Sequence, residues 1–421
     1  MPENNAEYHV PAESIKSLLT RLDQFLQPYY PHFGRKETRG HAHMYVEGRL
    51  QRLQRRTLEP IATEHGVNRR PLQTFVGAGK WADEPVVEQL NEQVAEEIGT
   101  PDGVLIFDAS GLPKFGTESV GVKRQWCGRL GKIENCQVGE YLGYASPKGH
   151  TLVDCRLYLP KDWAKDRKRR AKAHVPKDVR FKKGWELALD MMRTRAAILP
   201  HKWVLGDDAY GRVTELRDLL DSDGEAHILE VPHNTMVRKN TTGKAQSVSS
   251  VAASIPKKQW TSVRTRDGEK GPIDVRATKL RVIAGSDPEE GRRRETLLIV
   301  RRPSTGEIWF YLSNSKGVSV AKMAKAAACR HYIEQSLETA KGDAGLAEYE
   351  VRSWVGWHHH MTLSLLATFF LARERGRLKK NTRFDDVASS VRNVTLDRVR
   401  KSNRRRHSEA RRSSDQQFEA Q

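Results

Sequence analysis

Two short apolar runs, each followed by aspartate, constrain the fold more than any other feature of this sequence. Residues 104–107 (VLIF) precede Asp108, and residues 203–206 (WVLG) precede Asp207 and Asp208. A continuous apolar run predicts a strand buried on both faces, which requires a sheet covered by helices. Side chains at the ends of such strands reach solvent while their backbone stays rigid. We therefore expect Asp108 and Asp207 at strand ends; the alternative for either one alone is capping of the next turn.

The other patterns complete a mixed α/β chain with a β-rich insertion. Further strands are predicted near residues 137–145, 152–159 and 227–231, and helices near 185–198, 213–220, 318–341 and 348–376. A hairpin is expected about Ser304, Thr305 and Gly306, where glycine favours a turn between two apolar runs. The expected parts are a helical N-terminal domain, the main sheet, the β-rich insertion, closing helices and a basic, disordered tail, at 1–100, 101–232, 233–315, 316–376 and 377–421.

The charge balance indicates a polyanionic partner. Lys and Arg number 72 against 53 Asp and Glu, so the formal net charge is +19. DNA, RNA and an anionic membrane surface all fit such a charge, and the charge alone does not indicate catalysis. The four cysteines form no CxxC pair, which argues against a zinc ribbon and a disulfide framework and favours reduced thiols.

No segment of the sequence predicts secretion or membrane insertion. The N-terminus, MPENNAEYHV, lacks the charged and then apolar layout of a signal peptide. The longest apolar run, residues 361–372, is too short to span a bilayer. We expect a soluble, cytoplasmic protein with no membrane partner.

Residues 57–76 predict two short helices joined by a glycine turn. Apolar residues form one stripe before His65 and Gly66 and a second stripe after them. This is the pattern of a helix-turn-helix, in which Arg69, Arg70 and Gln73 would face outward on the second helix and read DNA. An ordinary helical hairpin is the alternative, and Pro71 fits only in the first turn of its helix.

A charged row on the helix expected at 318–341 offers a third carboxylate. Its members, at i, i+4, i+8 and i+11, share one helix face: Arg330, Glu334, Glu338 and Lys341. One interpretation is a solvated, salt-bridged face, because Arg330 and Glu334 form an ordinary i, i+4 pair. The other is a helix that holds metal through glutamate and phosphate through its basic neighbours. Three carboxylates suit two Mg²⁺ or Mn²⁺ ions roughly 3.5–4 Å apart, which is the arrangement for in-line attack on a phosphodiester.

At these residues the chain resembles the DDE transposases of bacterial insertion sequences, and most closely the insertion-sequence-701 group. The matching text includes LIFDASGLPKFGTESVGVKRQWCGRL, LVDCRLYLPKDWAKD, WVLGDDAYG and RHYIEQSLETAKGDAGLAEYEVRSWVGWHHH, and the similarity spans most of residues 58–372. The resemblance implies an RNase H-like catalytic domain. It identifies Asp108 as the first catalytic aspartate, and its D-x-x-Y-G context selects Asp207 over Asp208 as the second.

The third carboxylate of that superfamily lies in the pattern Y-x2-R-x3-E-x6-K. Arg330, Glu334 and Lys341 match it, which selects Glu334 over Glu338. Ala327 occupies the tyrosine position, so that side chain is absent or is supplied from elsewhere, with Tyr332 as a candidate.

The resemblance implies a cytoplasmic, nucleoid-associated bacterial enzyme that acts on double-stranded DNA. It would cleave transposon ends and join the 3′ strands to target DNA as a homodimer. Arg330 and Lys341 would contact phosphate near the cut. Relatives carry a β-rich insertion, in some of them with a tryptophan that stacks on a flipped base; Trp260 and Trp309 are candidates, with a core role the favoured alternative.

Two further features and two further functions stay open at this stage. His358, His359 and His360 are expected to be structural or to face DNA, since neighbouring helical residues point about 100° apart. The basic stretch 161–183 is expected to be a loop that is either solvated or in contact with DNA phosphates. A catalytically silent DNA-binding regulator and a stand-alone nuclease of the same fold are the alternatives to a transposase.

Overall fold

The computed structural model describes residues 17–51, 53–268, 271–284 and 294–377, with the side chains of 267 and 268 left out. The basic tail expected to be disordered lies outside the described residues, except for Arg377, which ends the last helix. Within this part of the chain, no helix combines the length and the apolar character needed to cross a bilayer.

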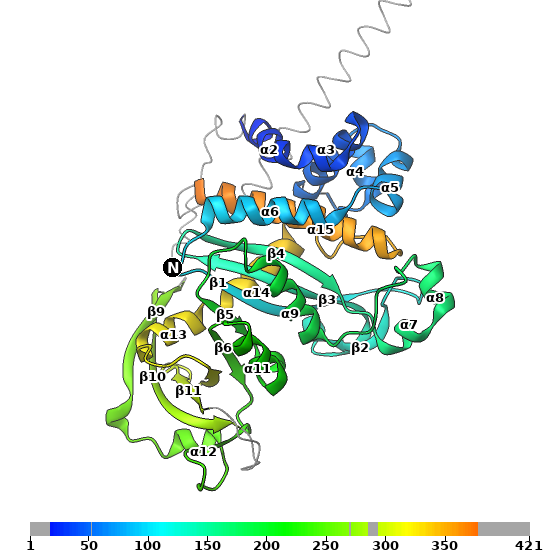
Figure 1. Cartoon of the computed structure of the whole chain (residues 1–421). Helices are drawn as coiled ribbons and strands as arrows, with labels where there is room; N and C mark the ends of the chain where they lie inside the picture. Colours follow the sequence, from blue (N-terminus) through cyan, green and yellow to red (C-terminus); the bar gives the residue numbers. More distant parts are fainter. Residues whose placement is uncertain (1–16, 52, 269–270, 285–293, 378–421) are drawn as a thin grey trace, which may run out of the picture.

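In the described part of the chain, a mixed sheet of 12 strands runs through the protein (Figure 1). Its main path is β2-β3-β1-β5-β6-β12-β11-β10-β7-β8, while β4 pairs with β3 and β9 with β10. The strands are β1 (Val104–Pro113), β2 (Lys123–Cys127), β3 (Lys132–Ser146), β4 (Gly149–Leu157), β5 (Trp203–Gly206), β6 (His227–Val231), β7 (Met236–Arg238), β8 (Gln246–Ser247), β9 (Thr261–Gly268), β10 (Gly271–Ala284), β11 (Arg294–Arg301) and β12 (Ile308–Ser313). The expectation of a mixed α/β sheet is confirmed.

The two apolar runs form neighbouring parallel strands at the centre of this sheet. Val104 pairs with Trp203 and Ile106 with Leu205, and β5 in turn pairs in parallel with β6. The expectation that the first strand ends at Asp108 is wrong, because β1 continues to Pro113. Its other edge is paired with β3 over the whole length of β1, so the strand persists after β5 has ended.

Helices cover the sheet and surround the long helix α15. The helices are α2 (Leu18–Leu26), α3 (Lys36–Leu50), α4 (Leu58–Glu64), α5 (Arg69–Ala78), α6 (Asp83–Ile98), α7 (Lys161–Lys165), α8 (Arg167–Lys172), α9 (Gly184–Arg195), α10 (Asp208–Gly211), α11 (Thr214–Ser222), α12 (Val248–Ala253), α13 (Val320–Ala328), α14 (His331–Gly342) and α15 (Trp354–Arg377). Three 3₁₀ turns accompany them at Gln27–Phe33, Gly128–Leu130 and Lys257–Gln259.

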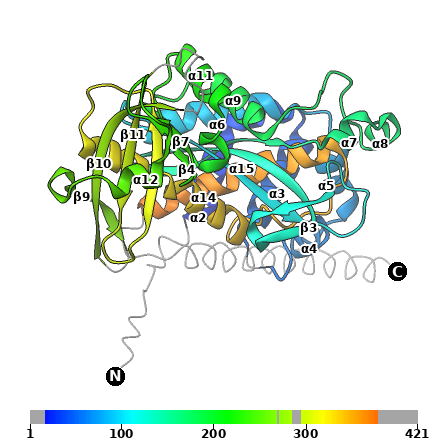
Figure 2. The same ribbon diagram turned by 90° about the horizontal axis from the view of Figure 1, so that it is seen from below.

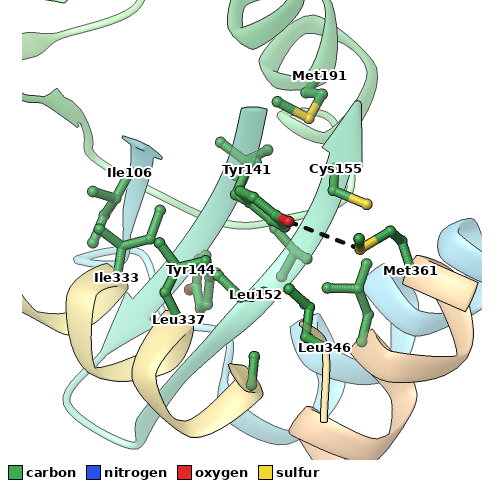
Figure 3. Close-up of a cluster of buried hydrophobic side chains, with 14 of the residues drawn as sticks. Ile106, Tyr141, Tyr144, Leu152, Cys155, Met191, Ile333, Leu337, Leu346 and Met361 are labelled. Atoms are coloured by element: carbon green, nitrogen blue, oxygen red, sulfur yellow. Dashed lines mark hydrogen bonds between the residues drawn. The ribbon is translucent and has the colours of Figure 1, made fainter. Parts of the chain in front are cut away.

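Helix α15 lies between the sheet and the N-terminal helices, and it packs against β4, α3, α5 and α6 (Figure 1). It is therefore buried on nearly all sides from Gly356 to Leu371. Figure 3 shows the layer below it, where the Tyr141 hydroxyl donates to the Met361 sulfur at 3.8 Å and Ile333 packs near Ile106. Because of this packing, the helices before residue 100 share one hydrophobic core with the sheet.

The single helix expected at 318–341 is two helices, α13 and α14, separated at Cys329 and Arg330. The two halves pack on different parts of the sheet: α13 contacts β9 and β10, whereas α14 contacts β1, β3 and β4. This change of packing partner explains the break, which periodicity along the sequence does not reveal.

The β-rich region 233–315 extends the main sheet, since β12 pairs with β6 through Phe310 and Val231. It also has a second, smaller core, formed around Val237, Leu297 and Phe310. The expected hairpin joins β11 to β12, with Arg301 opposite Ile308. Figure 2 shows this region at one end of the molecule and helices α7 and α8 at the other.

Candidate active site

Asp108, on β1, and Asp207, directly after the end of β5, lie at neighbouring positions in the sheet. The register that pairs Ile106 with Leu205 brings Asp108 level with Asp207 when it is continued by two residues. One oxygen of each carboxylate accepts a backbone N–H at 2.9 Å, from Ala109 and Ala209 respectively. Asp207 also caps the short helix α10, so the capping role considered for it is present. Capping and ligand binding are compatible, because each carboxylate keeps a second oxygen.

The two aspartates carry negative charge that nearby cations do not balance. Burial raises the pKa of Asp108 to about 7, with further contributions from the neighbouring Asp207 and from Glu334, while Arg330 acts in the opposite direction. Burial also raises the pKa of Asp207. In the described part of the chain, neither aspartate has a Lys or Arg ion pair within 4.0 Å. A buried carboxylate with this deficit of positive charge favours the binding of a cation.

Glu334 approaches from helix α14 and is held by arginine. Arg330 Nη1 lies 2.8 Å from Glu334 Oε1, and Arg330 Nε lies 3.4 Å from Glu230 Oε2 on strand β6. Glu334 is exposed on the helix face that the sequence predicted. Among the residues that the structure describes, no three His, Cys, Asp or Glu side chains converge closely enough to hold one metal ion. Glu334 would complete a ligand set with the aspartates only after a change in its ion pair with Arg330.

Lys341 follows Glu334 by about two helical turns on α14, and its charge interacts with that of Asp108. Burial lowers its pKa, while the negative charge of Asp108 raises it and Arg129 lowers it. The structure therefore brings Asp108, Asp207, Arg330, Glu334 and Lys341 into one electrostatic cluster.

Asp208 and Glu338, the two carboxylates that the resemblance did not select, have different surroundings. Asp208 is half-buried and forms an ion pair with Arg212 at 2.5 Å, four residues along the chain. Glu338 is exposed on α14, and no ion pair is recorded for it in the described residues. Asp208 thus has the cation that Asp207 lacks.

Three residues around the site were not singled out from the sequence. Glu140, on β3, is 5 % exposed and accepts a hydrogen bond of 2.5 Å from the Tyr210 hydroxyl. Burial raises the pKa of Glu140 to about 7, and the charges of Asp108 and Asp207 raise it further. Tyr210 is the tyrosine of the D-x-x-Y-G segment. The third residue is Glu230, whose pKa burial raises and Arg330 lowers. A glutamate inside the apolar text VGEYLGYA was the available signal for Glu140.

A hollow of about 730 Å³ opens beside Glu334, between α13, α14 and the β-rich region. Its lining includes Glu334, Arg330, Ala327, Tyr311 and Trp309. Tyr332, considered as the missing tyrosine, instead stacks on His150 with ring centres 4.9 Å apart. The hydroxyl-bearing ring next to Glu334 is that of Tyr311.

The two tryptophan candidates have different positions. Trp309 lines the hollow beside Glu334 and lies 5.1 Å from the guanidinium of Arg302, measured from its ring centre. Trp260 packs against the second core. Both tryptophans are partly buried and pack against a core, Trp309 against the main core and Trp260 against the second, and Trp309 also borders the site.

The helix pair expected at 57–76 is present as α4 and α5. Gly66 adopts a positive φ of 63° in the turn, and Pro71 lies in the first turn of α5. Arg69, Arg70 and Gln73 are exposed, and Arg69 pairs with Glu59. Helix α5 packs on α3, α4 and α15, whereas the candidate carboxylates lie on β1, directly after β5 and on α14.

The three consecutive histidines are structural. His359 lies between the carbonyl oxygens of Val76 and Trp81, at 3.0 and 2.9 Å, and its ring stacks on Trp81. His360 contacts the Tyr45 hydroxyl at 2.8 Å and the Leu346 carbonyl at 2.9 Å. All three histidines are buried in the contacts of α15, which excludes the DNA-facing alternative.

The basic stretch 161–183 is not a simple loop, because it contains the short helices α7 and α8. Trp163 anchors it: this side chain is 2 % exposed and donates to the Val122 carbonyl at 2.8 Å. The segment surrounds an open hollow of about 2040 Å³. Its lining is rich in cations, namely Lys161, Lys165, Arg167, Arg170, Lys177 and Arg180.

Comparison with known protein families gives one match. A family model described as a DDE superfamily endonuclease matches residues 28–272. The match covers 272 − 28 + 1 = 245 of the 421 residues and includes Asp108 and Asp207, but it ends before Glu334. No curated protein matched the chain.

Proposed function

Because this chain belongs to the DDE superfamily of endonucleases, we propose that it is a DNA transposase that cleaves transposon ends and transfers the 3′ strands to target DNA. The observation that carries the proposal is the pair of adjacent carboxylates, Asp108 and Asp207, whose pKa values are both raised and which form no Lys or Arg ion pair within the described residues. A helix bearing a glutamate, an arginine and a lysine faces them. We also propose that the chain belongs to the insertion-sequence-701 group, because the segments around Asp108, Asp207 and Glu334 resemble that group.

The donor set fits a hard divalent cation. Asp108, Asp207 and Glu334 offer only oxygen ligands, which Mg²⁺ and Mn²⁺ prefer, and a cation would relieve the repulsion that raises the pKa of Asp108. Two ions are proposed, held by these three residues. When bound, such ions activate water or a 3′-hydroxyl and stabilise the leaving oxygen.

The chain's own residues supply the remaining functions of the site. Arg330 holds Glu334 and, together with Lys341, would bind the phosphate next to the cut, where a guanidinium fork matches phosphate oxygens. Tyr210 and Glu140 fix the segment that follows Asp207, since their hydrogen bond ties α10 to strand β3. Trp309 is positioned to contact DNA that enters the hollow beside Glu334.

Double-stranded DNA is the proposed partner, and the basic hollow around α7 and α8 would contact its backbone. Arg69, Arg70 and Gln73 on α5 are proposed to read transposon ends. Since two ends are processed together, a homodimer on DNA is expected from symmetry. We propose a bacterial, nucleoid-associated location, because the chain resembles bacterial transposases that act on DNA.

The test is strand joining by the purified protein, with Mg²⁺, on a labelled duplex that carries the DNA flanking its own gene. The variants Asp108→Asn, Asp207→Asn and Glu334→Gln should neither cleave nor join. Asp208→Asn and Glu338→Gln are the matched controls and should retain activity. Cleavage without joining or end specificity would favour a stand-alone nuclease. Binding without cleavage by any protein would favour a DNA-binding regulator.

A further inference from the structure

The hairpin formed by β2 and β3 carries an exposed apolar cluster. Trp126 is 63 % exposed, Ile133 is 60 % exposed and Leu130 is 43 % exposed. We call these three residues the hairpin patch. Large apolar side chains that are this exposed and adjacent mark a contact surface more often than chance exposure does.

The hairpin patch is held in place by the pairing of β2 with β3 and by contact of the hairpin with β1. Trp126 and Ile133 are directly opposite each other in the ladder, and Leu130 lies in the 3₁₀ turn that joins the strands. The hairpin is fixed to β1 through Cys127, which is fully buried. A Cβ added to Gly111 would lie 2.8 Å from the Cys127 sulfur, so glycine permits this close approach three residues beyond Asp108. The patch therefore projects from a fixed hairpin.

A fourth apolar side chain extends this surface. Phe115, in the loop after β1, is fully exposed. The Asn135 side chain donates to the carbonyl oxygens on either side of it, at 2.7 Å to Lys114 and 2.8 Å to Gly116. Asn135 belongs to β3, so the loop that presents Phe115 is tied to the hairpin.

Cations surround the hairpin patch. Between residues 123 and 134 the sequence has four cations, namely Lys123, Arg124, Arg129 and Lys132, and one acid, Glu134. Lys123 pairs with Asp162, while Arg124 and Lys132 pair with Glu134, so the four cations and these two acids together carry a charge of 4 − 2 = +2. Strand β1, which carries Asp108, contacts both β2 and the 3₁₀ turn at Gly128–Leu130. The hairpin thus lies against the strand that carries Asp108, and its sequence is basic.

We propose that the hairpin patch receives unstacked bases of the DNA strand that flanks the cleavage point. Apolar and aromatic side chains bind the faces of unpaired bases, while neighbouring Lys and Arg bind the phosphates between them. A regular duplex would need only the cations. A second copy of this chain is disfavoured at this surface, because a symmetric contact would place the same cations opposite one another. This inference rests on the proposed function, since it requires DNA at the site.

The test measures binding in EDTA, so that cleavage does not contribute. Fluorescence anisotropy would compare a fully paired duplex with a fork of the same length that has unpaired bases at one end. Trp126→Ala should weaken binding of the fork about 5- to 100-fold, the range for loss of one base stack, and change binding of the duplex by less than about two-fold. Trp126→Phe should restore most of the affinity, because a flat aromatic ring remains.

A fluorescent base provides a second readout. With 2-aminopurine at the first unpaired position, the wild-type protein should quench the emission by stacking, and Trp126→Ala should leave it close to that of free DNA. Ile133→Ala should have a smaller effect in both assays. Ile308→Ala is the matched control, because Ile308 is 40 % exposed on a strand of the β-rich region. It should not change fork binding.

Two results would overturn the inference. One is equal binding of fork and duplex by wild type and Trp126→Ala, with equal quenching. The other is unchanged DNA affinity together with loss of a dimer in sedimentation, which would make the patch an interface between copies. If the wild-type protein binds no DNA at all, the proposed function fails as well. If it binds DNA but Trp126→Ala has no effect, only the hairpin inference fails.

Discussion

Two aspartates of the same sheet, Asp154 on β4 and Asp108 on β1, have opposite surroundings. Both strands pair with β3. Asp154 is fully buried and accepts hydrogen bonds from the Cys155 backbone N–H at 2.7 Å, from Arg156 at 2.5 Å and from Arg195 at 2.8 Å. Asp108 accepts one backbone hydrogen bond and faces another aspartate.

The difference shows how this chain separates structural from functional carboxylates. The charge of Asp154 is balanced by two arginines, one of which, Arg195, is itself 1 % exposed. The charge of Asp108 is left unbalanced, at a cost that a bound cation would remove. Burial alone does not distinguish the two residues; their partners do.

The largest expected effect is on catalysis. Asp108→Asn removes a proposed metal ligand and should reduce cleavage of transposon ends about 10³-fold or more, which corresponds to about 4 kcal/mol or more of transition-state stabilisation. The protein should remain folded, since Asp108 has no arginine that the change would leave unpaired. Single-turnover cleavage in Mg²⁺ measures the rate. A variant with a rate within ten-fold of the wild type would remove Asp108 from the mechanism.

The next effect is on folding. Asp154→Asn should lower the free energy of unfolding by about 1.5–3 kcal/mol, because the buried Arg195 guanidinium loses a charged hydrogen bond and keeps Glu84 as its carboxylate partner. Urea denaturation followed by circular dichroism measures this loss. Asp108→Asn serves as the comparison at the same pH. If both variants lost the same stability, the proposed division between the two aspartates would be wrong.

The pH dependence of the free energy of unfolding should also differ between the wild-type protein and Asp108→Asn. The pKa of Asp108 is raised to about 7 in the folded protein, so the folded state binds more protons than the unfolded state between about pH 4 and pH 7. The metal-free protein should therefore lose stability as the pH rises through this window. At pH 8, Asp108→Asn should be more stable than the wild type by on the order of 1–3 kcal/mol. Equal unfolding midpoints of the two proteins at pH 8 would contradict the raised pKa.

The smallest effect concerns the basic hollow around α7 and α8. Arg167→Ala and Lys177→Ala should each reduce the slope of log affinity for duplex DNA against log salt by about 1, because one phosphate contact is lost. Both side chains are exposed, so folding should be unchanged. Lys239→Ala, an exposed cation of the β-rich region, is the matched control. Unchanged slopes for both variants would show that DNA does not contact this hollow.

Sequence patterns predicted the two strands associated with Asp108 and Asp207, because a buried strand leaves a continuous apolar run, whereas the pairing of these strands comes from the structure. They did not predict that β1 continues to Pro113, since that depends on its antiparallel pairing with a strand about 30 residues further along the chain. The contact between Glu140 and Tyr210 joins residues 70 positions apart and was missed for the same reason.

The partners of carboxylates were the least predictable feature. Arg195 balances Asp154 from 41 residues away, and nothing in the local sequence of either residue indicates this pairing. The sequence does predict short-range ion pairs such as that of Arg330 with Glu334, because residues at i and i+4 share one helix face. Metal binding by Glu334 requires a change in its ion pair with Arg330, and a linear sequence pattern does not encode such a change.

The most direct test of the unbalanced aspartate pair is calorimetric titration of Mn²⁺ into the metal-free protein without DNA. The wild-type protein should bind Mn²⁺ saturably, and binding should strengthen as the pH rises towards about 7, because the carboxylates must lose their protons. Asp108→Asn and Asp207→Asn should lose this binding, while Asp208→Asn should retain it. Binding by Asp108→Asn with the stoichiometry and affinity of the wild type would contradict the account.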